Sequence, residues 1–445
     1  MAPRLFGTDG VRGVAGVWPL DPPTVARLGA ALVRERRKDR PLRLIVGRDT
    51  RESGEWIERE IGRGAAAEGA TVTSAGVIPT PAVAFLAKSA GFDLGIVLSA
   101  SHNPYGDNGI KVFSGSGEKF GESDERAIEG IMADTSWTTG SAADARVVAH
   151  DFSEGYLQHL RRLLPDPRGL RGAKIAVDMA NGATTSTAVR LLEGLGFTVI
   201  PLGNTPDGRN INLACGSTHP AGLATAVVHE QCRVGVAFDG DGDRAIFVDA
   251  RGRVVDGDAV LLLLGRDYQG RGALSGGAVV ATVMSNIGLE LSLRASGIRL
   301  IRTPVGDKYV MEELLSGGYV LGGEQSGHVI LTEHLPTGDG QATFLAVLRV
   351  MATTGRELHE LVADFVTYPQ TLVNVRVREK TPVGDVPEIR AAMSRVESAL
   401  EGRGRLLVRY SGTEPLLRIM IEGPDQASVQ AWAEEIAEAV RASLT

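Results

Sequence analysis

Residues 234–244 read VGVAFDGDGDR, in which a short apolar run passes directly into an acidic segment that alternates with glycine. The apolar run has the length and the residue types of a buried strand rather than a helix. Ligand sites in open α/β sheets lie beyond the carboxyl ends of the strands. We therefore expect residues 239–244 to form a functional loop at the edge of a sheet.

The chain around this stretch repeats the same arrangement. Short β-branched runs alternate with longer helical patterns, which is typical of βαβ units and mainly parallel sheets. The predicted strands form three groups, at residues 42–46, 71–77 and 94–98, at 174–177, 197–201 and 234–238, and at 278–283, 298–302 and 319–321. We predict an α/β fold with three similar mixed or parallel α/β domains, at residues 1–150, 151–250 and 251–367.

The pattern changes near Tyr368 and Pro369. The residues that follow predict a strand at 372–377, a helix at 386–400, strands at 405–409 and 416–421, and a helix at 427–442. Two neighbouring strands with a short connection favour antiparallel pairing. We therefore predict a smaller α+β domain at residues 368–445, and we expect the four domains to surround a central cleft.

The composition restricts the class of protein. The 445 residues allow about two to four domains, and 43% hydrophobic with 23% charged residues is ordinary globular usage. The formal net charge of −7 disfavours a nucleic-acid partner, because proteins that bind nucleic acids are usually basic. Cys215 and Cys232 form no disulfide framework, and no signal peptide or long apolar run is present. We expect a cytoplasmic protein with no membrane partner.

The acidic segment contains Asp239, Asp241 and Asp243, which single glycines separate. Three carboxylates this close repel one another unless a cation neutralises them, and the glycines allow the backbone to fold sharply around it. Oxygen ligands favour Mg²⁺ or Ca²⁺. A calcium EF-hand needs glycine and glutamate where this chain has Arg244 and Ala250, so the pattern favours Mg²⁺. A solvated acidic turn is the alternative.

The predicted strand at 94–98 ends at a loop that contains Ser101. Its position and its neighbours His102 and Asn103 make Ser101 a candidate nucleophile, although serine needs a base or prior activation. These residue types also favour turns, so an ordinary turn is the alternative. The G-x-S-x-G pattern of hydrolases is absent here, which disfavours acyl transfer. Lys111 is a candidate cation or proton carrier, with a solvated lysine as the alternative.

Two further segments carry candidate binding residues. Guanidinium groups, hydroxyls and backbone N–H groups that can bind a phosphate come from Arg409, Ser411, Gly412, Thr413 and Arg418. An ordinary turn is again the alternative, and the absence of a Walker A loop disfavours an ATPase. The other segment contains Glu324, Ser326 and His328, which can bind sugar hydroxyls and carry a proton near neutral pH. Together the four loops indicate phosphoryl transfer on a phosphorylated polyol.

These loops resemble those of the α-D-phosphohexomutase superfamily, and the resemblance covers essentially the whole chain. The shared strings are residues 99–104, 239–244 and 411–415. Strings that resemble the branch acting on glucosamine phosphates are 6–13, 210–212, 215–219, 282–286 and 322–328. Tyr410 is a departure, because the family usually has proline before Ser-Gly-Thr.

The resemblance implies a role for each candidate. Ser101 would carry the phosphoryl group, and its phosphate would bind one Mg²⁺ per subunit together with Asp239, Asp241 and Asp243. Sugar hydroxyls would be bound by Glu324 and Ser326. Substrate or its non-reacting phosphate would be bound by Arg244, Arg409, Ser411, Gly412, Thr413 and Arg418. Electrostatic or acid–base roles would fall to Arg12, Lys111 and His328.

The implied activity is that of an isomerase. The Ser101 phosphate passes to O1 of glucosamine 6-phosphate, the resulting 1,6-bisphosphate turns around, and its 6-phosphate returns to Ser101. The released glucosamine 1-phosphate supplies UDP-N-acetylglucosamine for the bacterial envelope. The bisphosphate is intermediate and activator, a phosphoryl donor must first charge Ser101, and the C-terminal domain is expected to move. Whether the chain forms a homodimer stays open.

Three other functions are compatible with these motifs, and each predicts a different observation. A phosphomannomutase/phosphoglucomutase of the same superfamily would differ in its relative turnover of the three sugar phosphates. An aspartyl-phosphate phosphatase that uses Asp239 would form an acyl phosphate, which hydroxylamine cleaves, and would tolerate Ser101→Ala. A sugar-phosphate sensor would show no turnover with Mg²⁺.

Overall fold

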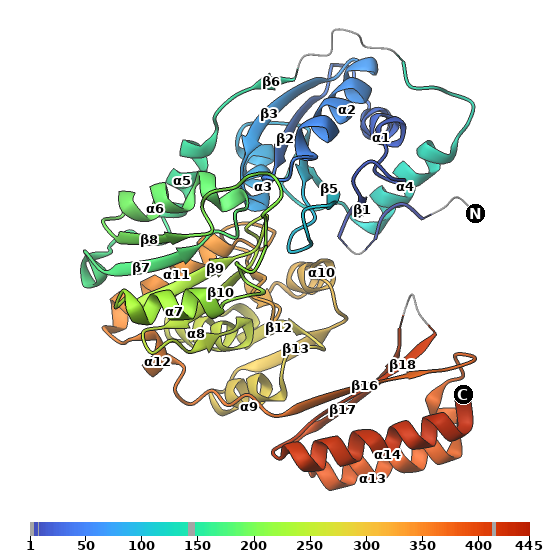
Figure 1. Ribbon diagram of the computed structural model, residues 1–445, viewed down its shortest axis with the longest axis vertical. Helices are drawn as coiled ribbons and strands as arrows, with labels where there is room; N and C mark the ends of the chain where they lie inside the picture. The colour runs from blue at the N-terminus through green and yellow to red at the C-terminus, as the bar shows by residue number, and fades with distance from the viewer. Residues whose placement is uncertain (1–3, 8, 141–146, 412–414) are drawn as a thin grey trace. The chain divides into compact units, whose positions relative to one another are not determined.

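The computed structural model describes residues 4–7, 9–140, 147–411 and 415–445 (Figure 1). The chain divides into two compact units. The first unit comprises residues 1–284 and 297–363, and the second comprises residues 285–296 and 364–445. Across the described residues, the first unit holds three β-sheets and the second unit holds one.

The first sheet has the strand order β1-β5-β4-β2-β3-β6. The strand bounds are Val11–Val14 for β1, Arg43–Arg48 for β2, Thr71–Val77 for β3, Leu94–Leu98 for β4, Asp107–Ser114 for β5 and Val148–Ala149 for β6. Strand β2 is parallel to β3 and β4, whereas β5 runs antiparallel to β4. Ser101 therefore lies in the connection between two adjacent antiparallel strands.

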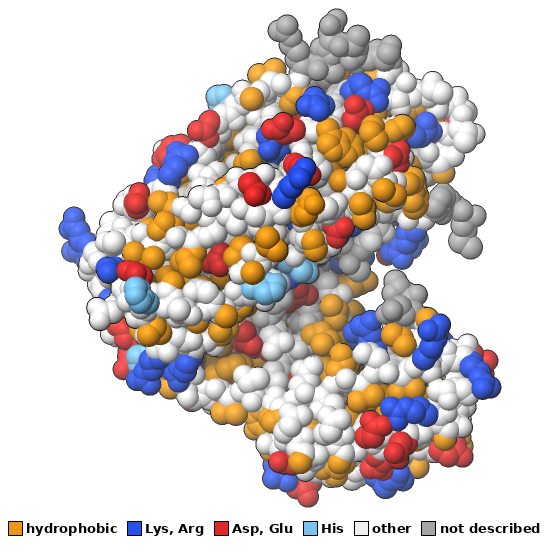
Figure 2. All heavy atoms as spheres, viewed as in Figure 1, with side chains coloured by type: hydrophobic (Ala, Val, Ile, Leu, Met, Phe, Trp, Pro, Cys, Tyr) orange, Lys and Arg blue, Asp and Glu red, His pale blue; other side chains and the backbone are white. Residues whose placement is uncertain are grey.

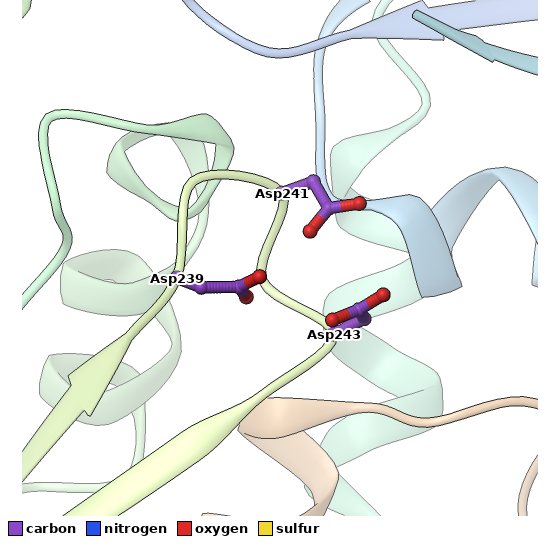
Figure 3. A group of neighbouring side chains, drawn as sticks. All are labelled: Asp239, Asp241 and Asp243. Atoms are coloured by element: carbon purple, nitrogen blue, oxygen red, sulfur yellow. The ribbon is translucent and has the colours of Figure 1, made fainter. Parts of the chain in front are cut away.

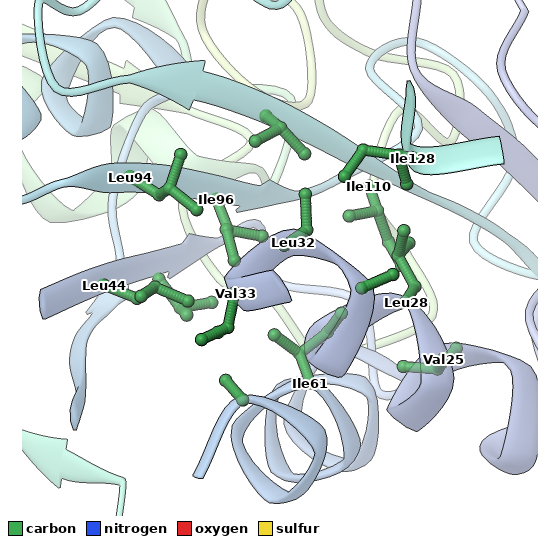
Figure 4. Close-up of a cluster of buried hydrophobic side chains, with 14 of the residues drawn as sticks. Val25, Leu28, Leu32, Val33, Leu44, Ile61, Leu94, Ile96, Ile110 and Ile128 are labelled. Carbon is green, nitrogen blue, oxygen red and sulfur yellow. The ribbon is translucent and has the colours of Figure 1, made fainter. Parts of the chain in front are cut away.

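Helices pack on this sheet and form its core. Their bounds are Pro22–Glu35 for α1, Gly54–Ala67 for α2, Thr80–Ser89 for α3 and Glu122–Ala133 for α4. Helix α1 begins after Asp21, whose side chain accepts a hydrogen bond from the Thr24 amide at 3.1 Å. Figure 4 shows Leu32 of α1 beside Ile96 of β4, and Leu28 of α1 beside Ile110 of β5, within one buried cluster. Burial of each such side chain contributes about 1.5–3 kcal/mol, so this core fixes the strand that leads to Ser101.

The second sheet has the order β11-β10-β9-β7-β8. Its strands are β7 Lys174–Asp178, β8 Thr198–Leu202, β9 Val234–Phe238, β10 Ala245–Asp249 and β11 Val254–Val255. The accompanying helices are α5 Ser153–Arg161, α6 Ala188–Gly194 and α7 Ala221–His229, with 3-10 turns at Arg168–Leu170 and Ala183–Ser186. Strands β9 and β10 are antiparallel, and Phe238 pairs with Ala245. The acidic segment is the connection between them.

The third sheet has the order β13-β12-β14-β15. Its strands are β12 Ala278–Thr282, β13 Arg299–Thr303, β14 Leu321–Gly323 and β15 Val329–Leu331. Its helices are α8 Gly257–Gly270, α10 Asp307–Gly317, α11 Gly340–Thr354 and α12 Leu358–Leu361, with a 3-10 turn at Ser275–Gly277. Side chains of Asp256 and Asp339 cap α8 and α11. The loop with Glu324 and His328 connects the antiparallel strands β14 and β15.

The second unit is an antiparallel sheet in the order β16-β18-β17 with helices packed against it. Its elements are α9 Ile287–Ala295, β16 Gln370–Arg376, α13 Pro387–Leu400, β17 Arg405–Tyr410, β18 Leu416–Glu422 and α14 Gln426–Leu444, with a 3-10 turn at Val383–Asp385. Ile419 of β18, Ile389 of α13 and Ile436 of α14 are fully buried in its core. Asn286 exchanges two 2.9 Å hydrogen bonds with the backbone of Tyr368, which ties α9 to this unit.

The predicted architecture of three α/β domains and a smaller α+β domain is confirmed. Strands β5, β10 and β15 are missing from the sequence prediction. Each strand comes directly after a functional loop, where an α/β pattern predicts a helix. Hydrophobic periodicity alone therefore does not predict a strand that pairs antiparallel with the one before the loop. The domain boundaries stay predictions, and residues 285–296, predicted within 251–367, fall in the second compact unit.

The described surface is mixed in charge. On the face shown in Figure 2, acidic and basic side chains are interspersed, in keeping with 54 acidic and 47 basic residues in the sequence. Within the described residues, no helix combines the length and the apolar character needed to cross a bilayer.

Candidate functional site

Three of the predicted loops meet in the first unit. The Ser101 hydroxyl donates a hydrogen bond to Oδ2 of Asp239, which joins the loop after β4 to the loop after β9. The backbones of Arg244 and His328 form a β-bridge, which joins the loop after β9 to the loop after β14. Each loop follows the carboxyl end of a strand, as the sequence predicts, and the three sheets bring these ends together.

Ser101 is buried, with 1% of its surface exposed, and its backbone is unusual. Its φ is 54°, a left-handed conformation that costs an L-residue other than glycine about 1–2 kcal/mol. Its amide donates to Oγ of Ser99 at 2.9 Å, and its Oγ lies 3.3 Å from Nδ1 of His102. The backbone turn directs the hydroxyl toward the acidic loop rather than toward solvent.

The three acidic side chains converge, as Figure 3 shows. Asp239, Asp241 and Asp243 are all buried, and one carboxylate oxygen of each lies within 4.8 Å of the others. Oδ1 of Asp241 has no hydrogen-bond partner among the described residues, although it is buried. Orphaned buried oxygens and an all-oxygen donor set are the chemistry of a Mg²⁺ site, so these residues fit that ion. The hydroxyl of Ser101 stands beside the same carboxylates.

The pKa values of Asp239 and Asp243 in this loop are shifted in opposite directions. Burial raises the pKa of Asp239 well above its usual value, and the neighbouring charges of Asp243 and Asp241 raise it further. Burial also raises the pKa of Asp243, but the charges of Lys111 and His328 outweigh this effect and hold the pKa well below its usual value. Asp239 therefore binds a proton more readily than Asp243 does.

Lys111 reaches the loop from β5. Its Nζ lies 2.8 Å from Asp241, 3.2 Å from Asp243 and 3.1 Å from Asp9. Burial lowers the pKa of Lys111, but the charges of Asp241, Asp9 and Asp243 outweigh burial and raise the pKa well above its usual value. Arg12 of β1 forms an ion pair with Asp9. Both predicted cations therefore lie in one charge network with the acidic loop.

His328 and Arg244 approach the same carboxylates. Nδ1 of His328 is 3.5 Å from Asp243, and Nε of Arg244 is 3.9 Å from it. Burial lowers the pKa of His328, but the charge and hydrogen bond of Asp243 outweigh burial and raise the pKa to about 9. The Arg244 amide also donates to Oδ1 of Asp239 at 3.2 Å. Each predicted residue here carries positive charge beside the acidic loop.

The predicted sugar-binding residues lie on the next loop. Glu324 and Ser326 are half-buried, and the Ser326 hydroxyl donates to Oε2 of Glu324 at 3.3 Å. The Gly306 amide donates to Oε1 of the same carboxylate at 3.3 Å. The Glu324 carboxylate is held in place by a hydroxyl and an amide, and the Glu324 backbone amide donates to the His328 carbonyl at 2.8 Å. A carboxylate and a hydroxyl held side by side can accept and donate hydrogen bonds to vicinal hydroxyls.

The predicted phosphate loop belongs to the second unit. Arg409 of β17 stands directly opposite Arg418 of β18 in the antiparallel register. Burial lowers the pKa of Arg409, and the charge of Arg418 lowers it further. Lys380 donates to the Ser411 carbonyl at 2.7 Å, and the Tyr410 hydroxyl donates to the carbonyl of Thr381. The two remaining predicted ligands, Gly412 and Thr413, lie outside the described residues.

Sequence reasoning missed several groups at this site. Asp9 contacts Lys111 and Arg12, and Lys119 bridges Asp9 to Asp307 of α10, the latter at 2.8 Å. Lys111, Lys119 and Asp307 are distant from Asp9 in sequence, so no spacing indicates these contacts. The only available signal for Asp9 is its position inside the string 6–13. Arg51 and Asn212, which contact the Ser101 loop, are also missed.

The chain is similar to known proteins over its whole length. Models of the four parts of phosphoglucomutase/phosphomannomutase match it, as alpha/beta/alpha domain I at residues 3–139, domain II at 154–252, domain III at 256–368 and the C-terminal domain at 372–439. The phosphoglucosamine mutase of Solibacter usitatus is 48% identical over 450 aligned residues, covering 100% of both chains.

Solved structures share the fold. A phosphoglucomutase/phosphomannomutase family protein from Burkholderia thailandensis has a TM-score of 0.81 at 24% identity, covering 99% of this chain and 97% of the other. The N-acetylphosphoglucosamine mutase of Aspergillus fumigatus, in complex with GlcNAc-6P and magnesium, has a TM-score of 0.66 at 17% identity, with 99% and 96% coverage. At these identities the likeness concerns the fold.

Proposed function

Because the chain belongs to the phosphoglucomutase/phosphomannomutase family, we propose that it interconverts glucosamine 6-phosphate and glucosamine 1-phosphate through a phosphoserine enzyme. The full-length relative at 48% identity, which is named for this activity, supports the amino sugar as substrate. The observation that carries the chemistry is the buried hydroxyl of Ser101, hydrogen-bonded to the acidic loop. No other described serine hydroxyl is hydrogen-bonded to one of the three converging carboxylates.

Ser101 is proposed as the phosphoryl carrier. In the forward step the bond from phosphorus to Oγ breaks, a bond to O1 of the sugar forms, the sugar hydroxyl gives up its proton, and Oγ takes one. In the second step the bond from phosphorus to O6 breaks, a bond to Oγ forms, Oγ gives up its proton, and O6 takes one. Charge accumulates on the transferring group, and Lys111, Arg244 and His328 are positioned around the acidic loop to stabilise it.

The acidic loop is proposed to hold Mg²⁺. Asp239, Asp241 and Asp243 would bind the ion through one carboxylate oxygen each, and the Ser101 phosphate would complete the site. When bound, Mg²⁺ would neutralise negative charge on the phosphoryl group. Magnesium in the complex of the Aspergillus enzyme supports this assignment. The three carboxylates, buried and close together, supply the charge that such an ion requires.

Substrate binding is divided between two regions. Glu324 and Ser326 are proposed to bind the sugar hydroxyls, and Arg409, Ser411 and Arg418 the non-reacting phosphate. A glucosamine 1,6-bisphosphate intermediate and an outside donor that first phosphorylates Ser101 belong to the same proposal. The two thiols, Cys215 and Cys232, are unpaired, which supports a reducing cytoplasmic location.

The deciding experiment measures turnover of phosphorylated enzyme with Mg²⁺ on glucosamine 1-phosphate, with glucose 1-phosphate and mannose 1-phosphate assayed beside it. We expect clear preference for the amino sugar. Equal or greater efficiency on glucose or mannose phosphate would keep the chemistry and transfer the assignment to a phosphomannomutase/phosphoglucomutase. A hydroxylamine-sensitive acyl phosphate in place of phosphoserine would support Asp239 as the carrier and overturn the proposal.

A further inference from the structure

Arg51 has no role in the site described above, yet it is buried directly behind it. Its side chain is 0% exposed, and Nε donates to Oδ2 of Asp49 at 2.8 Å. The remaining N–H groups donate to four backbone carbonyls of one loop. These are Ser101 at 3.1 Å, Asn103 at 2.8 Å, Asp107 at 3.0 Å, and Pro104. The planar guanidinium thus fixes the course of the whole Ser101 loop.

The other side of the Ser101 peptide is fixed by the same network. The Ser101 amide donates to Oγ of Ser99 at 2.9 Å, and the Ser99 hydroxyl donates to Oδ2 of Asp49. Asp49 in turn accepts the hydrogen bond of Arg51. The Ser101 N–H is therefore bonded to Ser99, the Ser101 C=O is bonded to Arg51, and Asp49 connects Ser99 to Arg51. Because both backbone groups of Ser101 are hydrogen-bonded in this way, the residue is held at a φ of 54°.

A second side chain, from a loop next to a different sheet, also binds the Ser101 carbonyl. Asn212 lies between β8 and α7, and its Nδ2 donates to the carbonyls of Ser101 at 2.9 Å and Asn103 at 3.1 Å. The segments that carry Arg51 and Asn212 are themselves connected. The Glu52 amide donates to the Gly208 carbonyl at 3.0 Å, and a 2.7 Å ion pair joins Glu52 to Arg209. Arg51 and Asn212, hereafter the Ser101 clamp, therefore converge from two domains on two carbonyls.

We propose that the Ser101 clamp consists of positioning residues that hold the carrier oxygen in line for phosphoryl transfer. The inference rests on the proposed function, because it takes Ser101 as the carrier. In the described residues neither side chain is hydrogen-bonded to Asp239, Asp241 or Asp243, although Asn212 packs against Gly240 of that loop. Both side chains act through the backbone of Ser101. Relaxation of Ser101 from its left-handed conformation would swing Oγ away from Asp239. A displacement of about 1 Å in a reacting atom is enough to cost roughly 10²-fold in rate.

The test uses phosphorylated full-length enzyme and follows a single transfer from Ser101 to glucosamine 6-phosphate, normalised per phosphoserine by mass spectrometry. We expect Arg51→Lys to slow this step about 10²-fold, because lysine lacks the fork that reaches four carbonyls. Asn212→Ala is expected to slow it about tenfold, which corresponds to roughly one hydrogen bond. The KM for the sugar and the Mg²⁺ dependence should stay within about twofold, since no ligand changes.

Arg233→Lys is the matched control. Arg233 also pairs with a carboxylate, Glu357, and donates to a carbonyl, Gly169, but it lies before β9 at the end of the strand remote from Asp239. Its transfer rate should equal that of the unmodified enzyme. A ³¹P spectrum of the phosphoserine gives a second readout, which should change in Asn212→Ala and not in Arg233→Lys.

The outcomes distinguish failure of the proposed function from failure of the Ser101 clamp proposal. If unmodified phosphoenzyme transfers nothing to the sugar, the proposed function fails. If it does transfer, and folded clamp variants match its rate per phosphoserine, the clamp is only structural and the inference is overturned. If Arg51→Lys does not fold, Asn212→Ala decides, because Arg51 still supports the loop in that variant.

Discussion

The Ser101 region and the Arg409 region handle charge in different ways. Around Ser101, cations and carboxylates are buried together, and Lys111 alone contacts three aspartates. In the second unit, Arg409 and Arg418 are only partly buried, and they face each other across β17 and β18. Like charges directly opposite each other destabilise a sheet, and an anion between them relieves the repulsion. The contacts of the first region are formed without substrate, whereas the second region should gain stability if it binds phosphate as proposed.

The difference in burial matches the roles proposed for the two regions, with the reaction at Ser101 and phosphate binding at Arg409. A group that reacts must be held in one geometry, and buried, fully bonded neighbours provide it. A group that only binds phosphate can be half-exposed, because its energy comes from bidentate charge-assisted hydrogen bonds. Substitutions in the first region should therefore reduce kcat, and substitutions in the second should raise KM.

Ser101→Ala should reduce turnover to the background of the assay, at least about 10⁴-fold, because no other group replaces a covalent carrier. The measurement is steady-state interconversion with added bisphosphate and Mg²⁺. Substrate binding, followed by calorimetry, should be nearly unchanged. Residual turnover above about 1% of the original rate would show that another residue carries the phosphoryl group, with Asp239 the first to examine.

Asp243→Asn should weaken Mg²⁺ binding by at least about 10²-fold, since even the partners of metal ligands typically contribute 10–100-fold to affinity. The readout is the Mg²⁺ concentration that gives half-maximal activity, together with direct calorimetric titration of the ion. Asp249→Asn is the matched control, because Asp249 is also buried at a turn but pairs with Arg253. An unchanged Mg²⁺ affinity in Asp243→Asn would remove this residue from the metal site.

Much of this first region could be predicted from sequence, because its residues sit in short strings after recognisable strands. Ser101, the three aspartates and His328 each lie in one such loop. Arg51 and Asn212 could not be predicted, because their function depends on which backbone carbonyls they reach. Asp9 reaches Lys111 only because β1 pairs with β5 in antiparallel register. Spacing in sequence carries no information about that pairing.

Arg409→Gln should raise the KM for the sugar phosphate about 10²-fold and lower kcat much less, because the guanidinium is proposed to bind a phosphate that does not react. The same substitution removes one of two facing cations, so we expect the thermal stability of the second unit to stay equal or rise. Steady-state kinetics and thermal unfolding test both parts. A fall in kcat with an unchanged KM would place Arg409 in the chemical step.

The smallest effect concerns the packing that supports the first region. The ring of His159 on α5 stacks between Phe85 of α3 at 4.4 Å and His334 at 4.2 Å. Nε2 of His334 lies 3.2 Å from Asp339, which caps α11. Elements that belong to three different sheets thus meet at one histidine pair. Burial, followed by the charge of His334, lowers the pKa of His159 from 6.5 to about 4.

The sign of the resulting pH dependence follows from this lowered pKa. The folded chain binds fewer protons at His159 than the unfolded chain does between pH 6.5 and about 4, so the stabilisation is present above that window and is lost as the pH falls through it. His159→Phe keeps the stacked ring and removes the proton site. We expect its thermal unfolding midpoint to fall less steeply between pH 7 and pH 5 than that of the unmodified protein.

His229→Gln provides the comparison, because the His229 side chain is 81% exposed and lies outside this stack. Its midpoint should follow the unmodified protein at every pH. Carboxylates elsewhere titrate equally in all three proteins, so the difference between their slopes isolates His159. Parallel curves for His159→Phe and the unmodified protein would show that the histidine stack does not couple proton binding to the stability of the Ser101 region.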